Sequence, residues 1–360
     1  MRRSELSACA VLTAALVVAC GAPPQAGKSA AQAPEPKAAT ELARAEAPAV
    51  DSVPSSAPAP LQTDALVPKV EFPPPDFAPP FPRSAKPGDG KWVALGDSSA
   101  GDFAGAEPHL LFSTVVHPHE VSRFISVSVI AVDLTRAALE LVPGTEDPEA
   151  PQVPASERTG LIPAEHHASA LAVFNGGYQT PHGRWGVMVE PNVFVPPRLE
   201  GCTLALYRDG SARIATWPAL AATQKDMLAF RQTPPCLVEQ AELHPDLKAW
   251  RERAWGGRVP NVKTRNRSAV GVDRTGRVLF YGYGDEAGAA LLGEGMRMAG
   301  AHAAAQLDIN YYWTRFLLIG KKKPAAPLQI TSSLAPKMQY QKRGYVAVAE
   351  KRDFFYVRRR

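Results

Sequence analysis

The sequence has little cysteine, and the spacing of the cysteines it does have excludes several kinds of site. The chain has 360 residues and four cysteines: Cys9, Cys20, Cys202 and Cys236. No Cys-x-x-Cys or His-Glu-x-x-His spacing is present, which removes the usual basis for a zinc site. We therefore predict no metal site. No cofactor is evident, and a divalent cation has no support in the sequence.

The sequence also lacks the pattern of a nucleic-acid-binding surface. The formal net charge is only +5, and part of the excess comes from two basic runs at 321–323 and 358–360. Basic residues do not alternate with aromatic residues as they do on surfaces that bind nucleic acid. We interpret the runs as solvated and predict no nucleic-acid partner. The sequence gives no oligomeric state.

The apolar run at the N-terminus is too short to be a membrane-spanning helix. It follows Arg2 and Arg3 and ends at Ala19, a pattern typical of a secretory signal peptide. The residues VVAC, ending at Cys20, resemble a bacterial lipobox; the alternative is an ordinary signal peptide with an incidental cysteine. The lipobox predicts a signal peptide over 1–20, lipidated Cys20 and a membrane contact through that lipid. Gly21 follows Cys20 at the position where the resemblance associates Asp with retention in the inner membrane. We therefore expect the outer membrane of the bacterial cell envelope, with the protein facing the periplasm or the cell surface.

The segment after the signal peptide has few aromatic or branched residues. Sixteen of the 35 prolines lie between Pro23 and Pro87, mixed with Ala, Ser and scattered charges. Such a segment buries too little apolar surface to offset the entropy lost on ordering. We predict a disordered tether over 21–90 and one folded domain over 91–360. In an exported domain, Cys202 and Cys236 are candidates for a disulfide, and two buried thiols are the alternative.

The pattern of apolar residues in the domain predicts many strands and few helices. We expect an α+β fold, with a mixed, largely antiparallel sheet and a few packed helices. A hairpin of two long strands is expected over 123–142, a second hairpin over 268–283, and a helix over 286–299. Further strands are expected at 170–174, 202–207, 212–216, 303–308, 316–319 and 345–349.

Three pieces of this chain, in order, resemble the phosphodiester glycosidase family, which removes sugars linked through a phosphodiester. They are ALAVFNGGYQ, RSAVGVDRTGRVLFYGYG and AGAHAAAQLDINYYWTRF, beginning at 170, 267 and 299. The resemblance covers roughly residues 110–355. It favours an enzyme, namely an envelope-anchored hydrolase that cleaves a sugar-phosphodiester linkage in a cell-envelope glycan or a related glycoconjugate. The implied partner is a carbohydrate or sugar phosphate.

The third piece departs from the family pattern directly after Asp308. The family has a run of glycines and a serine at this point, whereas this chain has INYYW over 309–313. A glycine run lets backbone amides approach a ligand, and the larger side chains fill that space. The alternative is therefore a non-catalytic glycan-binding lipoprotein on a degenerate glycosidase scaffold.

The candidate site residues lie in or beside these pieces. Asn175 follows a buried strand and could bind a sugar hydroxyl, while Gly176 and Gly177 would let backbone N–H groups reach a phosphate. A tight turn is the alternative for this Asn-Gly pair. Arg267 would hold a phosphodiester through its planar guanidinium group, or it is simply solvated.

Asp308 is the predicted catalytic carboxylate, with a strand-end cap as the alternative. Asn310 would share its face if the strand continues, and the two could bind a sugar or a cation together. His182 lies in an apparent loop, where it is either a substrate-binding residue or a surface histidine.

Overall fold

The computed structural model describes residues 70–95, 109–256, 265–309, 312–323 and 325–360. The chain divides into two units, Met1–Asp64 and Ala65–Arg360, and every described residue belongs to the second. The predicted signal peptide, Cys20 and most of the predicted tether therefore lie outside the described residues, as does Asn310. Within the described ranges, no helix is both long enough and apolar enough to cross a membrane.

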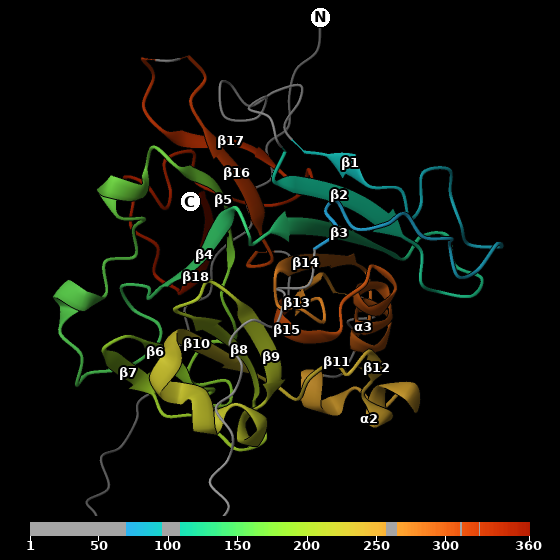
Figure 1. Ribbon diagram of the computed structural model, residues 1–360, viewed down its shortest axis with the longest axis horizontal. Coiled ribbons are helices and arrows are strands. Elements are labelled where there is room, and N and C mark those ends of the chain that lie inside the picture. Colours follow the sequence, from blue (N-terminus) through green and yellow to red (C-terminus); the bar gives the residue numbers. More distant parts are fainter. Residues whose placement is uncertain (1–69, 96–108, 257–264, 310–311, 324) are drawn as a thin grey trace, which may run out of the picture. The chain divides into compact units, whose positions relative to one another are not determined.

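The expected α+β class is wrong, because the described chain is mostly β-structure arranged in three antiparallel sheets (Figure 1). Nearly every apolar run is short and buried on both sides, as in β5 (Ala170–Asn175) and β8 (Cys202–Tyr207). Among the described residues, one segment carries apolar residues at helical spacing over several turns, and it forms α3 (Ala289–Met298). The other helical segments are short: α2 (Pro245–Lys248), η1 (Ala155–Glu157), η2 (Ala164–His166), η3 (Trp217–Ala219), η4 (Ala221–Asp226) and η5 (Arg253–Trp255).

The largest sheet has eight strands in the order β1-β2-β3-β14-β13-β15-β11-β12. Its centre contains the hairpin predicted over 268–283, in which Arg267 lies opposite Gly284 and Val272 opposite Leu279. The strands are β1 (Val93–Ala94), β2 (Leu111–Val116), β3 (Ser126–Asp133), β11 (Val238–Glu239), β12 (Glu242–Leu243), β13 (Arg267–Val272), β14 (Val278–Asp285) and β15 (Ala303–Ile309).

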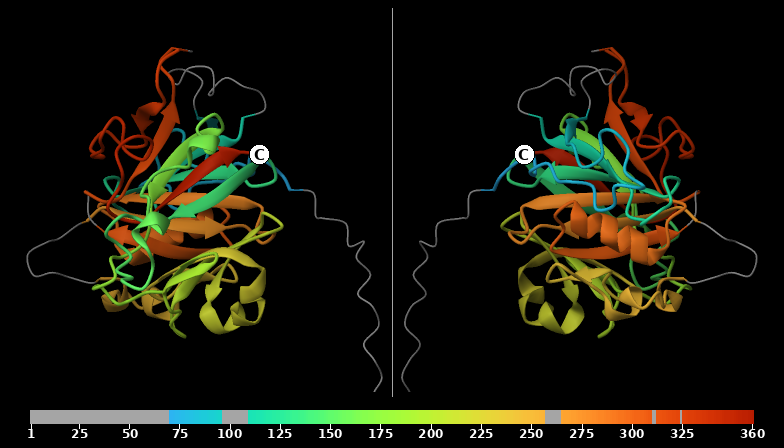
Figure 2. Two further views of the ribbon diagram at one scale, coloured as in Figure 1. Left: turned by 90° about the vertical axis from the view of Figure 1, so that its left-hand side faces the viewer. Right: turned by 90° about the vertical axis from the view of Figure 1, so that its right-hand side faces the viewer.

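The other two sheets have five strands each. One has the order β7-β6-β10-β8-β9 and the other has β17-β16-β5-β18-β4. Both views in Figure 2 show the orange strands β13–β15 running between these two sheets. The remaining strands are β4 (Ala137–Val142), β6 (Val187–Val189), β7 (Asn192–Val195), β9 (Ala212–Thr216), β10 (Met227–Thr233), β16 (Phe316–Gly320), β17 (Gln329–Ser333) and β18 (Phe354–Arg359).

One hydrophobic core is shared by all three sheets. It contains Val173 from β5, Leu204 from β8, Val270 from β13 and Phe355 from β18, each at most 1% exposed. A second cluster lies between the eight-stranded sheet and α3, where Leu292 and Met296 are fully buried. The three sheets are therefore packed into one body. This packing holds in place the strand ends that lie at the junction of the sheets.

Two of the predicted strand arrangements are wrong. Residues 123–142 do not form a hairpin, because β3 pairs with β2 and β14 whereas β4 pairs with β18 in another sheet. Residues 345–349 are not a strand either, and the final strand is β18. Local alternation identifies an extended segment, but it carries no information on the strand with which that segment pairs.

The ordered chain begins before residue 91. Phe72, Phe77 and Trp92 pack against the cluster beneath α3, although composition assigns 70–90 to the tether. His117 Nδ1 lies 2.8 Å from Asp89 Oδ2, and both side chains are buried. Phe72 and Phe77, together with the buried Asp89, attach this proline-rich segment to the domain.

Cys202 and Cys236 are joined by a disulfide. Cys202 begins β8 in a five-stranded sheet, and Cys236 lies just before β11 in the eight-stranded sheet. The two residues are 34 apart in sequence, and their Cα atoms are 4.8 Å apart. The bond therefore links two of the three sheets covalently.

We predict that replacing both cysteines with alanine lowers the free energy of unfolding by about 4 kcal/mol, because the unfolded chain gains the entropy of an open loop. Denaturant unfolding of the domain measures this difference. Reduced wild-type protein should lose a similar amount, while reductant should leave the double variant unchanged. An unchanged unfolding midpoint in the double variant would contradict the prediction.

Candidate active site

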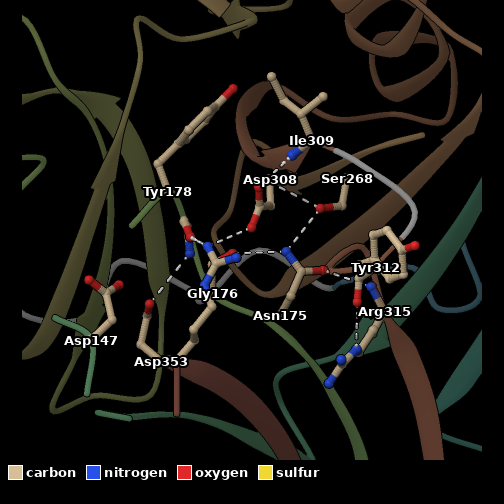
Figure 3. A network of polar contacts seen from close by, with 12 residues as sticks. Asp147, Asn175, Gly176, Tyr178, Ser268, Asp308, Ile309, Tyr312, Arg315 and Asp353 are labelled. Atoms are coloured by element: carbon tan, nitrogen blue, oxygen red, sulfur yellow. Dashed lines mark hydrogen bonds and ion pairs between the residues drawn. The ribbon is translucent and has the colours of Figure 1, made fainter. Parts of the chain in front are cut away.

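Polar residues from three strand ends meet where the sheets join (Figure 3). Asn175 ends β5, Ser268 lies in β13, and Asp308 lies near the end of β15. Asn175 Nδ2 donates to Ser268 Oγ at 3.0 Å, and the backbone N–H of Asp308 donates to the same oxygen at 3.3 Å. Asn175 Oδ1 accepts from Tyr281 Oη and from the backbone of Arg315. Both polar atoms of the Asn175 side chain are thus hydrogen-bonded to neighbouring residues, which they position.

A β-bulge sets the direction of Asp308. The pairing of β13 with β15 shifts between Arg267, which lies opposite Ile309, and Ala269, which lies opposite Gln306. Two residues of β15, Leu307 and Asp308, therefore face one residue of β13. Such an insertion turns the following side chain away from the regular alternation, and bulges of this kind are common beside active sites.

Asp308 is a buried carboxylate beside one arginine. Its side chain is 8% exposed, and Oδ2 lies 2.6 Å from Arg352 Nη2. The backbone N–H of Ile309 donates to Oδ1 at 2.6 Å. Burial raises the pKa of Asp308 to about 6, although Arg352 and the Ile309 amide both act to lower it. A carboxyl group with such a pKa can both release and accept a proton near neutral pH.

Asp308 opens into a cleft of about 440 Å³. The cleft is lined by segments that follow β5, precede β16 and β18, and connect β12 to β13. Its aromatic and charged lining residues are Tyr178, His182, Trp185, Arg253, Arg265, Asp308, Trp313 and Arg352. Among the described lining residues, Asp308 is the one carboxylate and three are arginines. The cleft is therefore suited to an anionic ligand.

Two of these arginines have no carboxylate partner within the described part of the chain. Arg253 is exposed and Arg265 is half-buried, and neither forms an ion pair there. Arg352 pairs with Asp308 and also lies over the Trp313 ring, with its Cζ 4.7 Å from the ring centroid. The positive charge of the cleft is thus divided between a fixed arginine at Asp308 and two arginines available to a ligand.

The glycines after Asn175 accommodate a buried ion pair of the protein itself. The backbone N–H of Gly176 donates to Asp353 O, and that of Gly177 lies 3.4 Å from Asp353 Oδ2. A Cβ atom at Gly176 would come within 2.0 Å of the Asp353 carboxylate. Neither glycine has the positive φ of a type I′ turn, and residues 176–179 form no turn, so the tight-turn interpretation also fails. The amides that we predicted would bind a phosphate already donate to Asp353.

Arg267 is buried and is not among the residues that line the cleft. It donates through Nη1 to Trp255 O at 2.6 Å and to Gln306 Oε1 at 2.8 Å, and burial lowers its pKa. Through Nη2 it also bonds to the carbonyl of Gly256, which lines the cleft. Arg267 therefore holds one wall of the cleft in place, and the arginine that pairs with Asp308 is Arg352.

The other predicted residues are more scattered. His182 is exposed at the rim of the cleft. Asn310 and Cys20 lie outside the described residues. Across the ranges that the structure describes, no three His, Cys, Asp or Glu side chains gather as a metal site would require.

The sequence interpretation missed Arg231, Arg352 and Asp353. Arg231 lies within the apolar strand β10, and the other two lie in the charged stretch Lys351–Asp353 just before β18. A charge inside an apolar strand is a usable signal, because an unpaired buried charge is very unfavourable. The identity of its partner, 122 residues away, was not readable from the sequence.

Comparison with known proteins gives no family assignment. No family model matches the chain, and no curated protein matches it. A solved zebrafish structure, the N-acetylglucosamine-1-phosphodiester alpha-N-acetylglucosaminidase catalytic domain auto-inhibited by its pro-peptide, aligns with 71% of this chain and 85% of its own. Its TM-score is 0.44 at 13% identity.

Two further solved structures align less well. A hypothetical protein from Synechocystis has a TM-score of 0.37 at 13% identity, covering 70% of this chain and 62% of that one. A putative exported protein from Burkholderia pseudomallei has a TM-score of 0.31 at 11% identity, covering 65% and 74%. These scores carry no functional argument, and the site is interpreted from its own residues.

We predict that Gly176→Ala lowers the free energy of unfolding by about 3 kcal/mol, because its Cβ would displace the Asp353 carboxylate from Arg231. Chemical unfolding measures the difference. The control is Gly88→Ala, where an added Cβ meets no atom within 4 Å and only the φ of +93° opposes the substitution. That change should cost roughly 1 kcal/mol. Equal losses in the two variants would contradict the packing described here.

Proposed function

We propose that this protein is a hydrolase that cleaves the glycosidic bond of a sugar linked through a phosphodiester. The observation that carries the proposal is the setting of Asp308, a buried carboxylate with a pKa near neutrality that opens into an arginine-rich cleft. The three sequence pieces that resemble phosphodiester glycosidases contain β5, β13 and β15, the strands that carry Asn175, Ser268 and Asp308.

The arginines suit the leaving group of such a reaction. A phosphodiester carries one negative charge and offers two oxygens to a planar guanidinium group. Arg352 lies next to Asp308, and Arg253 and Arg265 line the same cleft. Cleavage on the sugar side leaves a phosphate monoester anion, which is stable without immediate protonation. The leaving group therefore needs positive charge more than it needs a general acid.

Asp308 is then available to act at the sugar rather than at the phosphate. The transition state of glycoside cleavage develops positive charge at the anomeric carbon and its ring oxygen. Above its pKa, Asp308 is ionised, stabilises that charge and accepts a proton from the attacking water. Arg352 stays paired with the carboxylate, and Arg253 and Arg265 are the arginines available to the phosphate.

Aromatic residues give the cleft a surface for a sugar ring. Trp185, Trp313 and Tyr178 all contribute to its lining. The Cζ atom of Arg198 lies 5.0 Å from the Trp185 ring centroid, which fixes that side chain by a cation–π contact. The apolar faces of a pyranose pack well against such rings, while its hydroxyls remain free for polar contacts.

We predict that Asp308→Asn lowers kcat/KM for sugar-1-phosphodiesters by roughly 10²- to 10⁴-fold. In wild-type protein, kcat/KM should rise as the pH increases through about 6, because the ionised carboxylate is the active form. Steady-state hydrolysis of a panel of sugar-1-phosphodiesters between pH 4 and 8 measures both effects.

The control for this experiment is Asp226→Asn, an exposed carboxylate at the end of η4. It should leave both the rate and the pH profile unchanged. If wild type and Asp308→Asn show the same background rate, the hydrolase proposal is wrong. Retained binding of envelope polysaccharide without turnover would then support the glycan-binding alternative.

We also propose that the chain is anchored in the bacterial cell envelope, at the outer membrane, through lipidated Cys20. The support is the VVAC sequence at the end of an export signal, followed by a proline-rich segment. When the full chain is expressed in a bacterial host with a labelled fatty acid, Cys20→Ala should lose the label and leave the membrane fraction. Cys9→Ala is the control and should keep the label. Labelled Cys20→Ala would contradict the anchor.

A further inference from the structure

A second, smaller cavity lies against Asp308 and is separate from the substrate cleft. Its volume is about 20 Å³, which is room for one water molecule. Asp308, Trp313 and Arg352 line both spaces. The residues that line only the small cavity include Arg315, Tyr345 and Glu350. Asp308 thus stands between the cleft and a smaller polar cavity.

The small cavity is surrounded by groups that can bind water. Arg315 Nη1 donates to Tyr345 Oη at 3.2 Å and lies 3.5 Å from Glu350 Oε2. The Tyr345 ring packs edge-on against Phe354 with ring centroids 4.8 Å apart, which fixes the hydroxyl group. Asp308 Oδ2 is buried and accepts no aligned hydrogen bond, although Arg352 Nη2 lies 2.6 Å from it. A water in a polar site needs two to four partners, and these groups provide them.

We propose that this cavity holds one ordered water molecule that hydrogen-bonds to Asp308 and to the Tyr345 hydroxyl and connects Asp308 to Glu350. Glu350 is then a positioning residue that controls the proton on Asp308. The exchange moves one proton between the two carboxylates through the water and changes no other bond. The role in turnover rests on the proposed hydrolase function, whereas the water and the proton coupling do not.

The charged and titratable groups around Asp308 determine the direction of the coupling. Arg352 and Asp353 face it from the segment before β18, Arg315 from the segment before β16, and Tyr178 from the segment after β5. The carboxylates of Glu350 and Asp308 both act to raise the pKa of Arg315. Burial raises the pKa of Glu350, and its side chain is still 18% exposed, so it reaches solvent. Ionised Glu350 therefore competes with Asp308 for the charge of Arg315.

The test measures the pKa of Asp308 by carbon NMR of its carboxyl group. The measurement is made on the full domain, in wild type and in Glu350→Gln. Removal of the competing negative charge should lower that pKa by roughly 0.5 to 1. The matched control is Glu146→Gln, an exposed carboxylate paired with Lys351, the residue next to Glu350. It should leave the pKa of Asp308 unchanged. An unchanged value in Glu350→Gln would overturn the proposal.

The water itself is tested by a high-resolution crystal structure of the wild-type protein. We expect one water within hydrogen-bond distance of Asp308 and of Tyr345 Oη, and an empty cavity would overturn the proposal. If Glu350→Gln does not fold, Tyr345→Phe is the second variant, because it keeps the ring packing and removes one partner of the water. The water should then be lost, and a water retained at full occupancy in Tyr345→Phe would overturn the proposal as well.

The outcomes separate this inference from the proposed function. A lowered pKa of Asp308 with no turnover of any sugar phosphodiester would support the coupling and reject the hydrolase. Turnover by wild type with an unchanged pKa in Glu350→Gln would support the hydrolase and reject the coupling. If both hold, the acidic limb of the pH profile should move to lower pH in Glu350→Gln by the same amount as the pKa.

Discussion

Arg231 and Asp353 form an ion pair in which both side chains are at most 1% exposed. Arg231 belongs to β10 in one five-stranded sheet, and Asp353 immediately precedes β18 in the other. Buried charges are stable only when every polar atom is matched. Here Arg231 also donates to the carbonyls of Tyr178 and Gln232, and Asp353 accepts from the strand-end backbone at Gly177. The pair therefore fixes how these two sheets meet.

The arrangement of the candidate site follows from this pair. Asp353 can reach Arg231 only because Gly176 and Gly177 leave space for it. Once Asp353 is buried, its neighbour Arg352 is placed against Asp308, which β15 contributes from the eight-stranded sheet. Residues from all three sheets thus contact one another at this site. The Asp308 carboxylate is buried there, and burial outweighs the nearby arginine and raises its pKa.

This geometry also separates the two sides of Asp308. One side faces a cleft with arginines and aromatic rings, where a sugar and its phosphate would lie. The other faces a small polar cavity with Tyr345 and Glu350. In the proposed mechanism, a carboxylate between a bound substrate and Glu350 does not depend on bulk water in the cleft to change its protonation state.

By itself, the sequence determined the local features of this protein. It indicated the strand that ends at Asn175, the hairpin over 268–283, the helix near 286–299 and the carboxylate at the end of β15, because burial and alternation are local properties of the chain. The tertiary structure alone decided that β3 and β4 belong to different sheets and that Arg267 supports a wall of the cleft. It also decided that the glycines make room for Asp353, which joins Arg231 from 122 residues away. Pairing between distant strands depends on the packing of the whole core, so no local pattern specifies it.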